Sequence, residues 1–199
     1  TRESLKSASA RGEGMDSILK SQIDEISRQV GHGIGKPLLK IEAPARPIVD
    51  LTTSSMEAYE YYLRGRSDFE KYYHEDAQRS LEQAVAIDPE FAMAYLLMSR
   101  TAENLLDLDR SHEAMEYAFR YAAKTSEKER LYIAAGYAET IEKDTNKQLR
   151  LLQELVRKYP DEKYAFFALG RLFQERRAYP EAIAAMERSV ALDPAFGFA

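Results

Sequence analysis

Two stretches of this chain repeat one another: residues 75–94 read EDAQRSLEQAVAIDPEFAMA, and residues 180–199 read PEAIAAMERSVALDPAFGFA. The second stretch lies 105 residues after the first, which equals three periods of 34 residues plus three additional residues. A period of this length is typical of stacked helix pairs, whose core is continuous along the stack. The residues of the first copy that recur are Ala77, Glu82, Val85, Ala86, Asp88, Pro89, Phe91 and Ala94.

Prolines and capping residues predict where the helices end and begin. A proline follows an apolar helical stretch, which it cannot continue, at Pro89, Pro160 and Pro194. The spacing of a capping box occurs at Ser54 with Glu57, at Ser126 with Glu129 and at Thr145 with Gln148. The second copy, about residues 92–128, is longer than the others, and we place its three extra residues near residues 105–110.

The pattern resembles the tetratricopeptide repeat, and it does so over residues 55–199. The copy at residues 163–196 matches this motif best, with Phe166, Leu169, Gly170, Phe173, Tyr179, Ala182, Met186, Ser189 and Pro194. Small residues at positions 8, 20 and 27 of the motif let two helices approach closely. In the third copy, Gln148 replaces the small residue at position 20. The resemblance implies an all-α fold, a right-handed α-solenoid of antiparallel helix pairs.

The composition shift along the chain predicts three parts. Residues 1–35 form a short strand or arm and a helix, the remnant of a preceding domain. Residues 36–54 form a linker, because Pro37, Pro44 and Pro47 prevent a helix there. Residues 55–199 form four repeats, truncated at the start of a fifth. The chain begins at Thr1 instead of Met, so we expect a fragment of a longer protein.

A narrower resemblance concerns residues 51–66 and 126–139, which are similar to segments of bacterial signalling proteins. In those proteins a kinase, cyclase or winged-helix head precedes a TolB-like domain and then tetratricopeptide repeats. The resemblance implies a signalling parent, often membrane-anchored, with the repeats on its cytoplasmic or periplasmic side. The absence of cysteine is compatible with either compartment, so the location stays open.

Composition and spacing argue against several functions. The net charge of −5 leaves no broad cationic surface for nucleic acid, and no apolar run approaches the roughly 20 residues of a membrane span. His74 and His112 each begin like a zinc-binding H-E-x-x-H motif, but Gln78 and Glu116 stand where the second histidine belongs. The glycines of residues 31–37 lack the spacing of a phosphate-binding loop. We therefore expect no catalytic residue, metal or cofactor, and predict that the chain is not an enzyme.

The predicted site is the concave face, which the first helix of each pair lines in tetratricopeptide arrays. Aromatic residues and arginines, which dominate protein interfaces, recur there. The candidates are Tyr59, Tyr62, Arg66, Phe69, Met93, Leu96, Arg100, Asn104, Arg130, Tyr137, Tyr164, Phe167 and Arg171. The alternative is that these arginines pair with glutamates of neighbouring helices. Tyr62 and Arg66 depart from the clamp that binds chaperone tails, so such tails are not the expected ligand.

The sequence therefore predicts a protein-interaction module that binds a peptide or partner protein on its concave face. Two alternatives remain. Ile183, Met186 and Val190 on the last helix could mediate self-assembly into a homo-oligomer. Residues 1–35 could complete the active site of an enzyme, which is the weakest of the three hypotheses.

Overall fold

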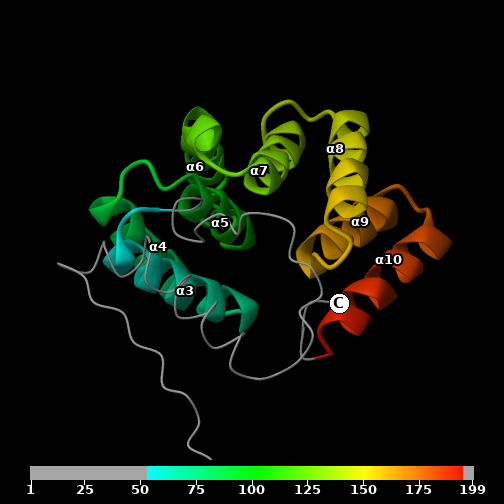
Figure 1. Cartoon of the computed structure of the whole chain (residues 1–199), viewed down its shortest axis with the longest axis horizontal. Coiled ribbons are helices and arrows are strands. Elements are labelled where there is room, and N and C mark those ends of the chain that lie inside the picture. Colours follow the sequence, from blue (N-terminus) through cyan, green and yellow to red (C-terminus); the bar gives the residue numbers. More distant parts are fainter. Residues whose placement is uncertain (1–52, 195–199) are drawn as a thin grey trace, which may run out of the picture.

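Four antiparallel helix pairs form the part of the chain that the computed structural model describes, residues 53–194 (Figure 1). Figure 1 shows the pairs following one another along a curved path, from teal α3 to red α10. The all-α prediction is confirmed, and the helices follow one another as repeated pairs. The predictions for residues 1–52 and 195–199 lie outside the described residues. The pairs are α3 (Met56–Glu70) with α4 (His74–Ile87), α5 (Ala92–Asn104) with α6 (Leu108–Tyr121), α7 (Glu127–Thr140) with α8 (Thr145–Lys158), and α9 (Lys163–Glu175) with α10 (Tyr179–Leu192).

Helix boundaries follow the predicted signals with two shifts. The capping box of Ser126 and Glu129 is confirmed at the start of α7. At α3 the cap is Ser55, whose Oγ accepts a hydrogen bond from the Ala58 N–H at 3.2 Å, so the prediction of Ser54 is wrong. The reason is Thr53, whose hydroxyl binds Asp88 and also accepts from the Ser55 N–H, which moves the helix start one residue later.

A second boundary differs at α8. Asp144 caps this helix through hydrogen bonds from the N–H groups of Asn146 and Lys147, and Thr145 is already helical. An ionised carboxylate is a stronger acceptor for these N–H groups than a hydroxyl. Gln148 is therefore not a capping residue, and its side chain is buried instead.

Small residues hold the first, second and fourth pairs together, as predicted. A Cβ on Gly65 would lie 2.7 Å from Leu81 Cγ, and one on Gly170 would lie 2.6 Å from Met186 Cγ. In the second pair, the fully buried Ser99 and Ser111 share a hydrogen bond of 3.1 Å. The helices of these pairs touch where only a small side chain fits.

The three extra residues lie elsewhere than predicted. The turns at residues 71–73 and 105–107 have the same length, so nothing is inserted near residues 105–110. The extra residues form η3 (Ala122–Lys124), between α6 and α7. Because no Asp-Pro stop follows α6, the chain continues into a tighter helical turn there. Ser111 is consequently the counterpart of Ala77 and Ala182, since each is the fourth residue of its helix.

The turn inside every pair contains a non-glycine residue with a left-handed backbone. These residues are Tyr72, Leu106, Lys143 and Arg177, with φ between 54° and 63°. Such a conformation costs an L-residue roughly 1–2 kcal/mol, and glycine avoids this cost.

We expect Leu106→Gly to raise the free energy of unfolding by about 0.5–1 kcal/mol, because the Leu106 side chain is 86% exposed and contributes little packing. Urea unfolding followed by circular dichroism measures the change. Leu105→Gly is the matched control: Leu105 has a φ of −84°, so glycine relieves no strain there and should destabilise. Equal effects of the two changes would contradict the explanation.

Candidate functional site

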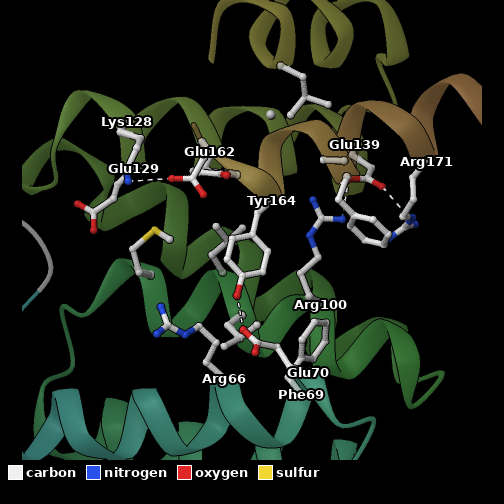
Figure 2. Close-up of a pocket in the computed structure, with 18 of the residues that line it drawn as sticks. Arg66, Phe69, Glu70, Arg100, Lys128, Glu129, Glu139, Glu162, Tyr164 and Arg171 are labelled. Atoms are coloured by element: carbon white, nitrogen blue, oxygen red, sulfur yellow. Dashed lines mark hydrogen bonds and ion pairs between the residues drawn. The ribbon is translucent and has the colours of Figure 1, made fainter. Parts of the chain in front are cut away.

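The first helices of all four pairs surround one cavity of about 360 Å³ (Figure 2). Its walls are mainly aromatic and aliphatic, and charged side chains from α3, α5, α7 and α9 point into it. Ten of the thirteen predicted site residues line it. They are Tyr59, Tyr62, Arg66, Phe69, Met93, Leu96, Arg100, Tyr164, Phe167 and Arg171.

Three predicted residues lie elsewhere. Asn104 lines a neighbouring hollow. Arg130 is exposed and donates a hydrogen bond to the Thr125 carbonyl. The Tyr137 ring stacks on Phe119 with 4.1 Å between the ring centroids. Neither Arg130 nor Tyr137 lines the cavity, so their predicted role in binding stays a prediction that the cavity does not support.

The orientation of α7 explains these misplacements. Tyr132, Ala135 and Glu139 of α7 line the cavity, and Gln148 and Leu152 of α8 reach it as well. The motif assigns the concave face to other positions, so sequence reasoning missed these residues. The sequence held one signal that the third pair differs from the others: Gln148 stands where the other repeats have a small residue.

A carboxylate links three helices along one side of the cavity. Arg100 Nη1 on α5 lies 2.8 Å from Glu139 Oε2 on α7, and Arg171 Nη2 on α9 lies 3.8 Å from Glu139 Oε1 (Figure 2). Burial by itself would raise the pKa of Glu139, but Arg100 and Arg171 outweigh it and hold that pKa below its ordinary value. The alternative raised from the sequence, that these arginines pair with glutamates of neighbouring helices, therefore holds for Arg100 and Arg171.

Arg66 differs from these two arginines. Its guanidinium lies over the Tyr62 ring, 5.8 Å from the centroid. Within residues 53–194 it forms no ion pair with a carboxylate. Lys128, the other cation of this region, is paired with Glu162 at 2.9 Å. Among the described cations that line the cavity, only Arg66 keeps its charge available for a ligand.

The first and fourth pairs meet across the cavity. The Tyr164 hydroxyl on α9 donates a hydrogen bond to Glu70 on α3, 94 residues away in the chain (Figure 2). Burial raises the pKa of Tyr164, and Glu70 raises it further, so this hydroxyl keeps its proton at neutral pH. Burial likewise raises the pKa of Tyr62 to about 12. Tyr62 and Tyr164 are therefore neutral hydrogen-bonding groups.

The histidines lie apart from the cavity. His74 packs against the rings of Phe69 and Tyr72, at centroid distances of 5.6 and 5.9 Å. His112 is exposed on α6. Across residues 53–194, no three His, Asp or Glu side chains gather in a way that could hold a metal ion. None of the helices described is both long and apolar enough to span a membrane.

Comparison with known proteins finds no match among family models and none among curated proteins. Two similar solved structures are "MamA 41-end from Desulfovibrio magneticus RS-1", at 19% identity, and "MamA RS-1 ArsTM double mutant", at 18%. Each alignment has a TM-score of 0.41 and covers 70% of this chain and 77% of the other. The description of the fold therefore rests on the helix pairs themselves.

Proposed function

We propose that this chain is a protein-interaction module whose cavity binds a segment of a partner polypeptide. The observation that carries the proposal is Arg66, a cation that stands in a largely apolar cavity without a carboxylate partner among the described residues. Charges away from water are usually paired, and an arginine pairs strongly with a carboxylate, so Arg66 is a suitable site for an anionic group of a ligand.

The lining supports a polypeptide ligand. Tyr59, Tyr62 and Phe167 offer rigid aromatic surface, and Met93 and Leu96 offer aliphatic surface beside them. Aromatic residues and arginine are the types that contribute most binding energy at protein interfaces. The segment that fits best has a large apolar side chain for the cavity and a carboxylate nearby for Arg66.

A random peptide library displayed on phage tests the proposal with the full 199-residue chain as bait. We expect wild type to enrich peptides that combine an apolar residue with Asp or Glu. Arg66→Ala should weaken the binding of an enriched peptide about tenfold to a hundredfold, because a charge-assisted hydrogen bond is lost. Fluorescence anisotropy of the labelled peptide measures the change in Kd.

Arg64→Ala is the matched control. Arg64 is on the same helix and also lies over a tyrosine, Tyr61, at 5.5 Å, but it is exposed and does not line the cavity. Its removal should leave the affinity unchanged. If both variants bind the peptide as wild type does, Arg66 is not a ligand-binding residue and the cavity proposal fails.

Self-assembly is a second candidate, supported by the last helix. Ile183 and Val190 on α10 are 58% and 37% exposed. Met186, between them in sequence, is partly buried against Gly170 on α9. A homo-oligomer formed through Ile183 and Val190 stays a prediction. The signalling parent and the absence of enzymatic activity also stay predictions.

A further inference from the structure

The third helix pair, α7 and α8, differs from the others at the point where its helices should touch. Ala77, Ser111 and Ala182 occupy this point on α4, α6 and α10, and the larger Gln148 occupies it on α8. Gly136 of α7 accordingly does not close on α8. A Cβ there would lie 3.0 Å from Met115 Cε on α6 and 3.1 Å from Leu96 Cδ1 on α5. In the third pair the Gln148 side chain therefore lies where α7 and α8 would otherwise touch, and this side chain lines the cavity.

Two buried polar atoms of this pair make no hydrogen bond of normal geometry with the described residues. Gln148 is only 4% exposed, and its Oε1 accepts no hydrogen bond from the described residues. The Tyr132 hydroxyl is also buried, and although Glu162 lies beside it, the two form no hydrogen bond of normal geometry. Both residues line the same cavity, whereas the other two such atoms, on His74 and Gln78, belong to residues outside it. Buried polar groups are nearly always paired, because leaving them unpaired is costly.

The two groups have complementary roles. The Gln148 oxygen is an acceptor that needs a donor. Burial, and then Glu162, raise the pKa of Tyr132, so its hydroxyl keeps its proton and can donate. A ligand that satisfies both must present one N–H and one C=O to this cavity, whose walls are mainly apolar. An amide group has this combination, and every residue of an extended polypeptide carries one.

We propose that Gln148 and Tyr132 bind a main-chain amide of the partner segment, with Gln148 Oε1 accepting from its N–H and the Tyr132 hydroxyl donating to its C=O. The inference rests on the proposed function, because it describes how the same cavity holds the same segment. It adds recognition of the backbone, which would make binding tolerant of sequence at that residue. Arg66 would then select the neighbouring carboxylate.

The test uses Gln148→Met and Tyr132→Phe, which keep the volume of each side chain and remove its hydrogen-bonding group. Each variant should bind the peptide enriched by wild type about tenfold more weakly. Each should unfold at the same temperature as wild type or a higher one, because an unpaired buried group has been removed. A merely structural role predicts the opposite, a loss of stability. Gln78→Met and Tyr61→Phe, outside the cavity, are the matched controls and should not change the affinity.

The enriched peptide is then scanned with single amide-to-ester replacements, each of which removes one N–H. One replacement should weaken binding to wild type and leave binding to Gln148→Met unchanged, which identifies the N–H that Gln148 accepts. If no ester has this effect and an Asn or Gln of the peptide is needed instead, the amide comes from a side chain and the backbone proposal is overturned.

The remaining outcomes separate the two proposals. If wild type enriches no peptide, the proposed function fails and this inference with it. If Gln148→Met and Tyr132→Phe bind the enriched peptide as tightly as wild type does, the proposed function stands and the inference is overturned. A fall in affinity that comes only with a fall in unfolding temperature also overturns it.

Discussion

Replacing Phe91 with alanine should lower the free energy of unfolding by about 3–5 kcal/mol. The Phe91 side chain is fully buried at the junction of the first two pairs, and its ring lies 5.0 Å from the Tyr62 ring, between centroids. The change removes apolar contacts with the cluster that contains Leu81 and Met98, and it leaves a cavity between the pairs. Small domains have only about 5–15 kcal/mol of stability, so the loss is a large fraction of the total. Urea unfolding followed by circular dichroism measures it.

Phe119→Ala is the control for this prediction. Phe119 is 46% exposed, and its ring contact with Tyr137 is at the surface. We expect a loss of about 1 kcal/mol, since a surface aromatic pair contributes about that much. A loss below about 1 kcal/mol for Phe91→Ala would mean that the first two pairs are not joined through this residue.

Replacing Glu139 with glutamine should cost about 1–3 kcal/mol at pH 7. The charges of Arg100 and Arg171 then face a neutral amide in a place where the Arg100 and Glu139 side chains are only 23% and 21% exposed. The cost is smaller than for a fully buried pair, because water still reaches these groups. Since Glu139 joins α5, α7 and α9, the loss should appear as a lower urea midpoint for the whole array.

The pH dependence has a definite sign. The folded-state pKa of Glu139 is below its ordinary value of 4.5, so the native state favours the ionised form. The resulting stabilisation is complete above about pH 4.5, which is the unfolded pKa, and is lost as the pH falls through the lower folded pKa. Glutamine does not titrate. The difference in stability between wild type and Glu139→Gln should therefore be constant from pH 7 to about pH 5 and shrink below pH 4.5.

Glu127→Gln is the control for the Glu139 prediction. Glu127 also pairs with a cation, Lys158, at 2.6 Å, and its pKa is also lowered, chiefly by the hydrogen bond from Lys158. Its side chain is 53% exposed, and such surface pairs contribute little to stability. If Glu127→Gln destabilises the protein as much as Glu139→Gln does, the ion pairs of Glu139 with Arg100 and Arg171 contribute no more to stability than a surface pair.

Local patterns in the sequence were sufficient for the helices and their pairing. Prolines cannot continue a helix, and α4, α8 and α10 end two residues before Pro89, Pro160 and Pro194. Glycine at residues 65 and 170 marked the points of close helix contact, because any larger side chain collides there. These features depend on residues within one or two turns of each other, so they can be read from spacing alone.

The tertiary structure decided how the helices face one another. Repeat spacing placed Arg130 and Tyr137 on the concave face, yet the α7 side chains that line the cavity include Tyr132, Ala135 and Glu139. The orientation of α7 depends on the combined packing of Gly136 against α5 and α6 and of Gln148 on α8, which no single repeat contains.

The state of the arginines was also a tertiary property. The sequence by itself determined that Arg66, Arg100 and Arg171 share a position within their repeats, and in the structure all three line the cavity. Only the fold brings Glu139 between Arg100 and Arg171 while it leaves Arg66 over an aromatic ring. The reason is physical: the repeat determines which face of a helix a side chain occupies, but an ion pair needs a few ångströms of distance between helices that are far apart in the chain.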